Sequence, residues 1–181
     1  MKKFLILLTI ISLTIAPTLA FGRIDGVPPS VKLPKKFTQE YIDYITDEYK
    51  TVTNNQLIMV ALDMLKGTDG DFSRKAILGY NLTGYPIKIE FKNLATVNKS
   101  YENFDAIGWK KRKKLYIYIN PKHQNAPPAA LAALLSHEAL HQDEYNSLSE
   151  ETYAWTMEAV VWIDLLAIYP DSNVETHPLV K

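Results

Sequence analysis

The chain has 181 residues, 47% of them apolar and 22% charged, which is the composition of a compact globular domain rather than of a fibrous or disordered chain. Lys and Arg together number 20, as do Asp and Glu, so the basic excess typical of nucleic-acid-binding proteins is missing and no nucleic-acid partner is expected. Cysteine does not occur, which excludes disulfides, cysteine nucleophiles and thiolate zinc sites. A metal ion would have to be bound by His, Asp, Glu or water.

Residues 1–20 have the pattern of a cleavable secretory signal peptide. Two lysines follow the first methionine, residues 4–16 form an uncharged and largely apolar run, and Ala20 ends a stretch of small residues. The apolar run is short for a transmembrane helix, which needs about 20 residues, and Pro17 would interrupt a helix there. We expect cleavage after Ala20, a secreted or periplasmic protein of residues 21–181, and no stable membrane insertion after signal cleavage.

The sequence after the signal peptide is predicted to divide into an arm, one domain and a tail. Residues 21–37 contain three prolines and are expected to form an extended arm, and the polar tail, residues 171–181, is expected to be loosely held. Residues 38–170 are expected to form the domain. Its first part is helical, because apolar residues recur at helical spacing over 38–49 and 56–66.

The middle of the domain has the alternating pattern of strands. Residues 87–91 alternate apolar and charged side chains, which predicts a strand with one solvent-exposed face. Residues 104–109 and 115–119 are expected to be two further strands, joined by five consecutive cations at 110–114. A solvated hairpin tip is the favoured interpretation of these cations over an anion-binding patch, because no aromatic residue is interleaved with them.

Two helices are expected after the strands. Pro127-Pro128 opens the first, which extends from Ala129 to about Gln142, is apolar on nearly every side and is therefore predicted to be buried at the centre of the domain. The second is expected over residues 148–169, with Pro170 ending it. These elements predict an α+β single domain, with a small antiparallel or mixed sheet packed on a buried helix and followed by a C-terminal helix.

The buried helix ends in an H-E-x-x-H motif, His137 to His141, which contains two of the four histidines in the chain. Residues four apart lie on one face of a helix, so both imidazoles can reach one ion. Zn²⁺ prefers such donors, and Glu138 beside the ion is placed to take a proton from a zinc-bound water. Two histidines that cap a core helix and are hydrogen-bonded to their neighbours are the alternative. The motif predicts a zinc site.

A catalytic zinc site needs a third protein ligand. A further histidine six residues after His141 would supply one, but that position is Ser147. Glu150 and Glu151 open the next helix, and a short connection would bring either carboxylate alongside His141. Because Ser147 and Glu150 match a capping box, we expect Glu150 to be used locally and Glu151, with the small Ala154 one turn later, to bind the metal. The alternative for both is an acidic first turn that complements the helix dipole.

Two motif histidines followed by a glutamate-bearing helix resemble the gluzincin metallopeptidases, in particular their compact single-domain members. The resemblance covers about residues 86–166. It implies a zincin-like fold with an edge strand that pairs with extended substrate. It also implies an exported zinc-dependent metallopeptidase that hydrolyses peptide bonds in a peptide or polypeptide, with His137, His141 and Glu151 as zinc ligands and Glu138 as general base. A zinc-binding exported interaction or scaffold domain without peptidase activity is the alternative.

Other parts of the gluzincin site have no clear counterpart in the sequence. Larger relatives often carry a carboxylate four residues after the glutamate ligand, and Trp155 occupies that position here. Tyr145 and Tyr153 are candidates for stabilising an oxyanion, and Asp143 and Glu158 are candidates for orienting the histidines. The helical spacing of three large apolar residues predicts that they belong to the core rather than to a substrate pocket: Trp155, Trp162 and Leu166.

Overall fold

The structure, a computed structural model, describes residues 37–141 and 147–180, so the predicted signal peptide and nearly all of the predicted arm lie outside the described residues. The described part forms one small α+β domain with five α-helices and one mixed sheet of three strands. In chain order its elements are α1 (Gln39–Tyr49), α2 (Gln56–Met64), α3 (Asp71–Ile77), β1 (Lys88–Phe91), β2 (Ala106–Lys111), β3 (Lys114–Ile119), α4 (Pro128–Glu138) and α5 (Leu148–Ile168). Within this part, no helix has both the length and the apolar character that crossing a membrane requires.

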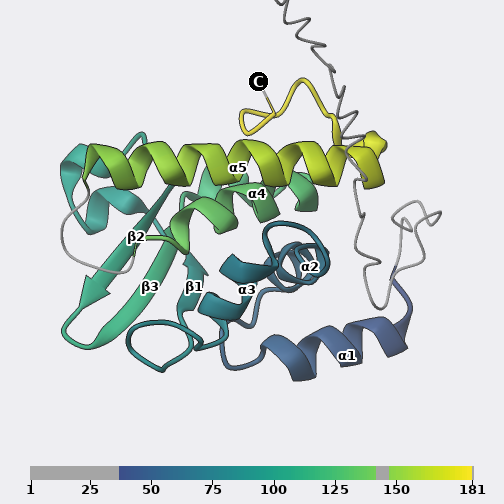
Figure 1. Cartoon of the computed structure of the whole chain (residues 1–181), viewed down its shortest axis with the longest axis horizontal. Helices are drawn as coiled ribbons and strands as arrows, with labels where there is room; N and C mark the ends of the chain where they lie inside the picture. Colours follow the sequence, from purple (N-terminus) through teal and green to yellow (C-terminus); the bar gives the residue numbers. More distant parts are fainter. Residues whose placement is uncertain (1–36, 142–146, 181) are drawn as a thin grey trace, which may run out of the picture.

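The sheet has the strand order β1-β3-β2, which leaves β2 at one edge (Figure 1). β1 runs parallel to β3, with Ile89 opposite Ile117, and β2 runs antiparallel to β3, with Gly108 opposite the same Ile117. One face of β2 contributes Ile107 to a small apolar cluster with Leu94 and Tyr118. The opposite face of β2 lies against α4.

The turn between β2 and β3 is tighter than the sequence predicts. The two strands pair as far as Lys111 and Lys114, which leaves Arg112 and Lys113 as the connecting residues. Arg112 adopts a positive φ of 59°, as the turns that close two-residue hairpins require. Three of the five cations at 110–114 therefore belong to the strands. The predicted five-residue hairpin tip is wrong, because only two residues form the turn.

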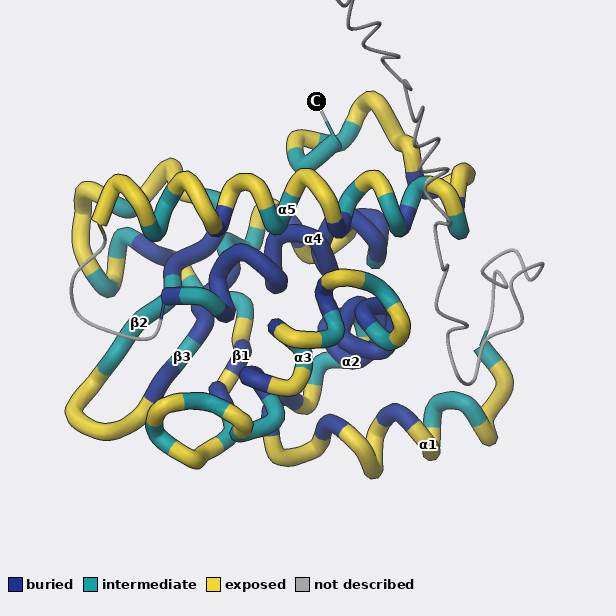
Figure 2. Tube along the Cα trace, in the orientation of Figure 1, coloured by how far each residue is buried: buried dark blue, intermediate teal, exposed yellow. Residues whose placement is uncertain are grey.

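Helix α4 is the centre of the domain. It contacts α2, α3, α5 and β2, and every residue from Ala129 to Glu138 is buried (Figure 2). Four of its residues are alanines, whose small side chains let the neighbouring elements approach closely. The predicted burial of this helix on all sides is confirmed.

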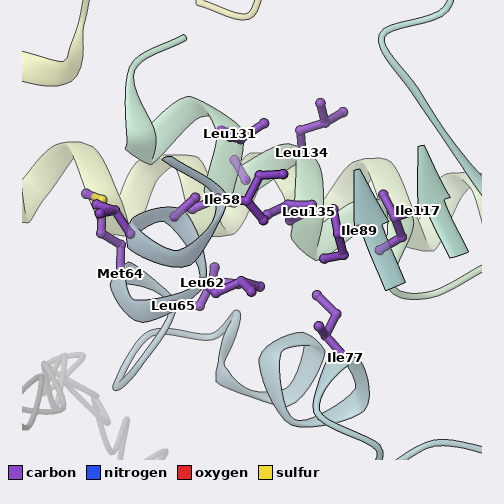
Figure 3. Packing of buried hydrophobic residues seen from close by; sticks show 14 of the residues in the cluster. Ile58, Leu62, Met64, Leu65, Ile77, Ile89, Ile117, Leu131, Leu134 and Leu135 are labelled. Atoms are coloured by element: carbon purple, nitrogen blue, oxygen red, sulfur yellow. The ribbon is translucent and has the colours of Figure 1, made fainter. Parts of the chain in front are cut away.

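The apolar core fills the space around α4 (Figure 3). Leu131 and Leu135 of α4 are fully buried, and Leu62 of α2 and Ile117 of β3 belong to the same cluster. A core that joins both the sheet and the N-terminal helices to one helix fixes the position of that helix on several sides. The C-terminal end of α4 is consequently a rigid place for a functional site.

Helix α4 ends earlier than the sequence predicts. Its α-helical part stops at Glu138 rather than near Gln142, because the chain tightens into bonds between residues three apart. The Leu140 N–H donates to the His137 carbonyl at 3.0 Å, and the His141 N–H donates to the Glu138 carbonyl at 3.3 Å. His141 therefore stands on a tightened final turn.

Part of the tail is held against the domain. After α5 the chain forms a short 3₁₀ turn at residues 170–172 and then turns back, so that its end lies over the long helix (Figure 1). Leu179 packs against the main apolar core. The His177 N–H donates to the Val174 carbonyl at 2.8 Å. These contacts join part of the tail to the domain, although most of residues 171–178 remain exposed.

Candidate metal centre

The two motif histidines lie side by side beneath α5. Their ring centroids are 5.1 Å apart, and both side chains are almost completely buried. His137 occupies the last turn of α4, and His141 the tightened turn that follows. Each ring presents its Nε2 atom to the same space, on the side from which Glu151 approaches.

Glu151 of α5 completes a cluster of three possible metal ligands. One of its carboxylate oxygens is 3.7 Å from Nε2 of His137, and the other is 3.7 Å from Nε2 of His141. Ligand atoms around a tetrahedral zinc ion are roughly 3.3–3.5 Å apart, given bonds of about 2.0–2.1 Å. The structure thus brings one ligand atom from each predicted ligand within 4.8 Å of the others, wider than the spacing around bound zinc, and no other such group occurs within residues 37–141 and 147–180.

A second carboxylate lies behind each histidine. Nδ1 of His141 is hydrogen-bonded to Oε1 of Glu150 at 2.8 Å. Nδ1 of His137 lies 3.0 Å from Oε2 of Glu158, which is an ion-pair distance, although the two atoms do not meet the geometry of a hydrogen bond. A carboxylate behind an imidazole orients the ring and places its donor proton on Nδ1. Nε2 of His141 is therefore left to act as a metal ligand, and the ion-pair distance to Glu158 favours the same arrangement for His137.

The side chain of Glu150 does not do what the capping-box pattern predicts. Ser147 does cap α5, because its hydroxyl accepts the Glu150 N–H at 3.1 Å. The Glu150 carboxylate, however, turns toward His141 instead of folding back onto the Ser147 backbone. Glu150 thus serves the metal centre from behind a ligand. Of the two residues that the sequence offers for orienting the histidines, Glu158 lies behind His137, and Asp143 lies outside the described residues.

Glu138 is buried beside the two histidines, with 6% of its surface exposed. Burial raises the pKa of its carboxyl to about 7, against the lowering effects of His137, His141 and the Gly108 N–H that donates to it. A carboxyl group with a pKa near neutrality can both take up and release a proton at physiological pH. Glu138 is therefore poised as an acid–base group.

The edge strand β2 touches the motif at Gly108. A Cβ atom on this residue would lie 2.7 Å from Cβ of His141 and 3.2 Å from the Glu138 carbonyl oxygen. Those distances leave no room for any side chain, so the glycine lets the strand and the end of α4 meet. This contact brings the Gly108 N–H to the Glu138 carboxylate.

The cluster opens into a cleft of about 560 Å³ between α4, α5, β2 and the end of the chain. Aromatic side chains form much of its wall: Tyr101, Phe104, Trp109 and Trp155. Trp155 is 61% exposed, and its ring centroid lies 4.9 Å from that of His137. The prediction that Trp155 belongs to the core is therefore wrong, since one helical turn after Glu151 a side chain faces the same cleft. Trp162 does pack against the core.

The tyrosines at the cleft are not the ones that the sequence suggests. Tyr153 is 55% exposed and does not line the cleft, and Tyr145 lies outside the described residues. Tyr101, by contrast, faces the cleft from a 3₁₀ turn far from the motif. No sequence signal could have found it, because only the tertiary fold brings that turn beside α4.

Comparisons with models of known protein families, with curated proteins and with solved structures find no match to this chain. The functional interpretation therefore depends on the geometry of the centre and on the motif itself.

Proposed function

We propose that the protein is an exported zinc-dependent metallopeptidase with a zincin-like fold. The observation that carries this proposal is the cluster of His137, His141 and Glu151 with the buried acid Glu138 beside it in an open cleft. Two imidazoles, one carboxylate and space for a fourth ligand are the features of a hydrolytic zinc site. The H-E-x-x-H motif at the end of a helix supports the same interpretation.

Each histidine would use one ring nitrogen for the metal and the other for a carboxylate. His137 and His141 would hold zinc through Nε2, with Glu158 and Glu150 fixing the rings through Nδ1, and Glu151 would complete the protein ligands from α5. When bound, zinc would polarise the scissile carbonyl and lower the pKa of a water molecule in its open position.

Glu138 would move the proton that hydrolysis requires. Its carboxylate would take a proton from the attacking water, and the resulting acid would pass that proton to the nitrogen of the departing amine. The pKa near 7 suits both steps. β2 lies at an edge of the sheet, where an extended peptide could pair with a strand, which favours a peptide over a compact small molecule as substrate.

The test is the conservative substitution Glu138→Gln in zinc-loaded protein. We expect hydrolysis of a mixed peptide library to fall by about 100-fold or more, because general-base catalysis contributes factors of that size, while zinc content stays near one ion per chain. Peptide products are measured by mass spectrometry and zinc by elemental analysis. Glu40→Gln, an exposed glutamate on α1, is the matched control and should keep full activity.

Two outcomes would contradict the proposal. Undiminished cleavage by the Glu138→Gln variant would remove Glu138 from the reaction. Stoichiometric zinc without cleavage by the unmodified protein would instead support a zinc-binding interaction or scaffold domain.

A further inference from the structure

The end of the chain forms part of the candidate active site. Pro178 and Leu179 line the same cleft as His137 and Glu138, although about 40 residues separate them in sequence. We call residues 174–180 the C-terminal segment. The C-terminal segment contributes no metal ligand and no acid–base group to the centre, so the proposed hydrolysis does not explain why it lines the cleft.

The C-terminal segment is held to the body of the domain. Leu179 packs against the main core, and its N–H donates to Nδ1 of His177 at 3.2 Å. The N–H of Val180 donates to the His177 carbonyl at 2.9 Å, which closes a second turn. These contacts fix Pro178 and Leu179 as a wall of the cleft.

A series of contacts places Pro178 and Leu179, which we call the wall, at one end of β2. The ring of His177 lies 5.5 Å from the ring of the fully buried His123, whose Nε2 is 2.7 Å from Oδ1 of Asp105. Asp105 directly precedes Ala106, the first residue of β2. The wall therefore stands where β2 begins, and the opposite end of the strand leads to the open hairpin turn.

The part of the cleft next to the start of β2 includes apolar side chains. Ala106, the first residue of β2, lines the cleft together with Leu134 and the two wall residues. The one acidic group there, Asp105, is neutralised by Lys122 at 2.7 Å. An apolar side chain is consequently the group that this end would accept most favourably.

We propose that the C-terminal segment determines substrate specificity, by limiting how far a peptide extends past the metal centre on the Asp105 side. The inference rests on the proposed peptidase function. The substrates are then peptides or proteins cleaved a short distance from one terminus, with a long extension accepted only toward the hairpin turn. The short part of the substrate, on the Asp105 side of the metal centre, carries an apolar side chain.

The test measures how far a bound probe can extend on each side of the centre. Two series of hydroxamates, which bind zinc, carry a leucine and up to about three alanines either on the acyl side or on the amine side of the metal-binding group. Dissociation constants for the zinc-loaded mature chain are measured by titration calorimetry. We expect one series to lose at least about tenfold in affinity as it lengthens, and the other series to keep its affinity.

Variants of the wall should remove this difference. In Leu179→Ala and Pro178→Gly, we expect the lengthened probes of the two series to bind within about threefold of each other. Val174→Ala, in the same segment but outside the cleft lining, should behave like the unmodified chain. A deletion of residues 177–181 provides a second, larger opening of the cleft, and circular dichroism checks that each variant is folded.

The outcomes separate this inference from the proposed function. If both series lengthen without loss in the unmodified protein, or if the difference persists unchanged in the wall variants, the C-terminal segment does not limit the substrate. Failure of zinc-loaded protein to bind even acetohydroxamate also overturns the inference. The proposed function fails differently, through absence of peptide cleavage by a protein that binds zinc and hydroxamate.

Discussion

Each imidazole in the candidate metal centre stands between two carboxylates, one on each ring nitrogen. Glu151 faces both Nε2 atoms, whereas Glu158 and Glu150 lie behind the rings. Three negative groups around two histidines would repel one another if no cation were present. The arrangement therefore stabilises positive charge beside the carboxylates, whether a proton on an imidazole or a bound metal ion.

In the proposed centre, Glu158 would act on the metal through His137, which would make it a positioning residue. We expect Glu158→Gln to weaken zinc binding by about 10–100-fold, because it removes the charge that orients the ring and raises its basicity. Zinc affinity is measured by competition with a chromogenic chelator. Glu40→Gln is the control for a lost surface charge and should bind zinc normally. An unchanged affinity in Glu158→Gln would show that the 3.0 Å contact does not orient the ring.

The pairing of the two histidines could be predicted from the sequence. Residues four apart lie on one face of a helix, and His137 and His141 remain side by side although His141 stands on the tightened turn after α4. The direction of the Glu150 side chain was predicted wrongly, because a capping box and a contact with His141 compete for the same carboxylate. Only the position of α5 relative to α4 decides between them. The prediction that Trp155 lies in the core is wrong because helical spacing alone does not reveal which face of α5 borders the cleft.

At the scale of elements, the site depends on the contact between β2 and the end of α4. Gly108 is the residue that permits it, since a Cβ there would meet the Cβ of His141 at 2.7 Å. Both atoms belong to rigid parts of the chain, so neither can move aside cheaply. A shift of β2 would therefore also shift His141 and the end of α4.

We expect Gly108→Ala to push β2 away from α4 and to lower the free energy of unfolding by about 1–3 kcal/mol, which is the usual cost of overpacking. Zinc binding should weaken as well, because His141 moves with the contact. Urea unfolding and zinc titration measure the two effects. Lys110→Ala, two residues further along the same face of β2, is the control. Normal stability in Gly108→Ala would mean that this contact is looser than the structure indicates.

The elements themselves were predictable to different degrees. Residues 39–49, 56–64 and 148–168 form the helices that their periodicity predicts, with small differences at the ends. Helix α3 was missed, because seven residues are too few for a clear helical period. The parallel pairing of β1 with β3 was also beyond prediction, since it joins segments whose register no local pattern specifies.

At the scale of the whole molecule, the buried Glu138 couples the stability of the metal-free protein to pH. Its pKa is about 7 in the folded state and about 4.3 when unfolded, so folding favours the protonated form. The stability that this preference contributes is complete below pH ~4.3 and is lost as the pH rises through about 7. The free energy of unfolding of the metal-free protein should consequently fall as the pH rises from about 4.3 to about 7.

We expect Glu138→Gln to lack this loss, because glutamine does not titrate. With a chelator present, the free energy of unfolding of the unmodified chain should fall relative to that of the variant by roughly 3 kcal/mol between pH 4 and pH 8, as the two pKa values imply. Urea unfolding at several pH values measures the difference. Glu40→Gln should track the unmodified chain throughout. Parallel curves for Glu138→Gln and the unmodified protein would place the Glu138 pKa near its ordinary value.

The turn of the last residues back onto the cleft has a consequence for shortened forms of the chain. Every residue of the candidate metal centre lies before residue 159, whereas the wall lies in residues 174–180. A chain that ends before residue 174 would therefore keep every residue of the candidate centre and lack the wall that bounds its cleft.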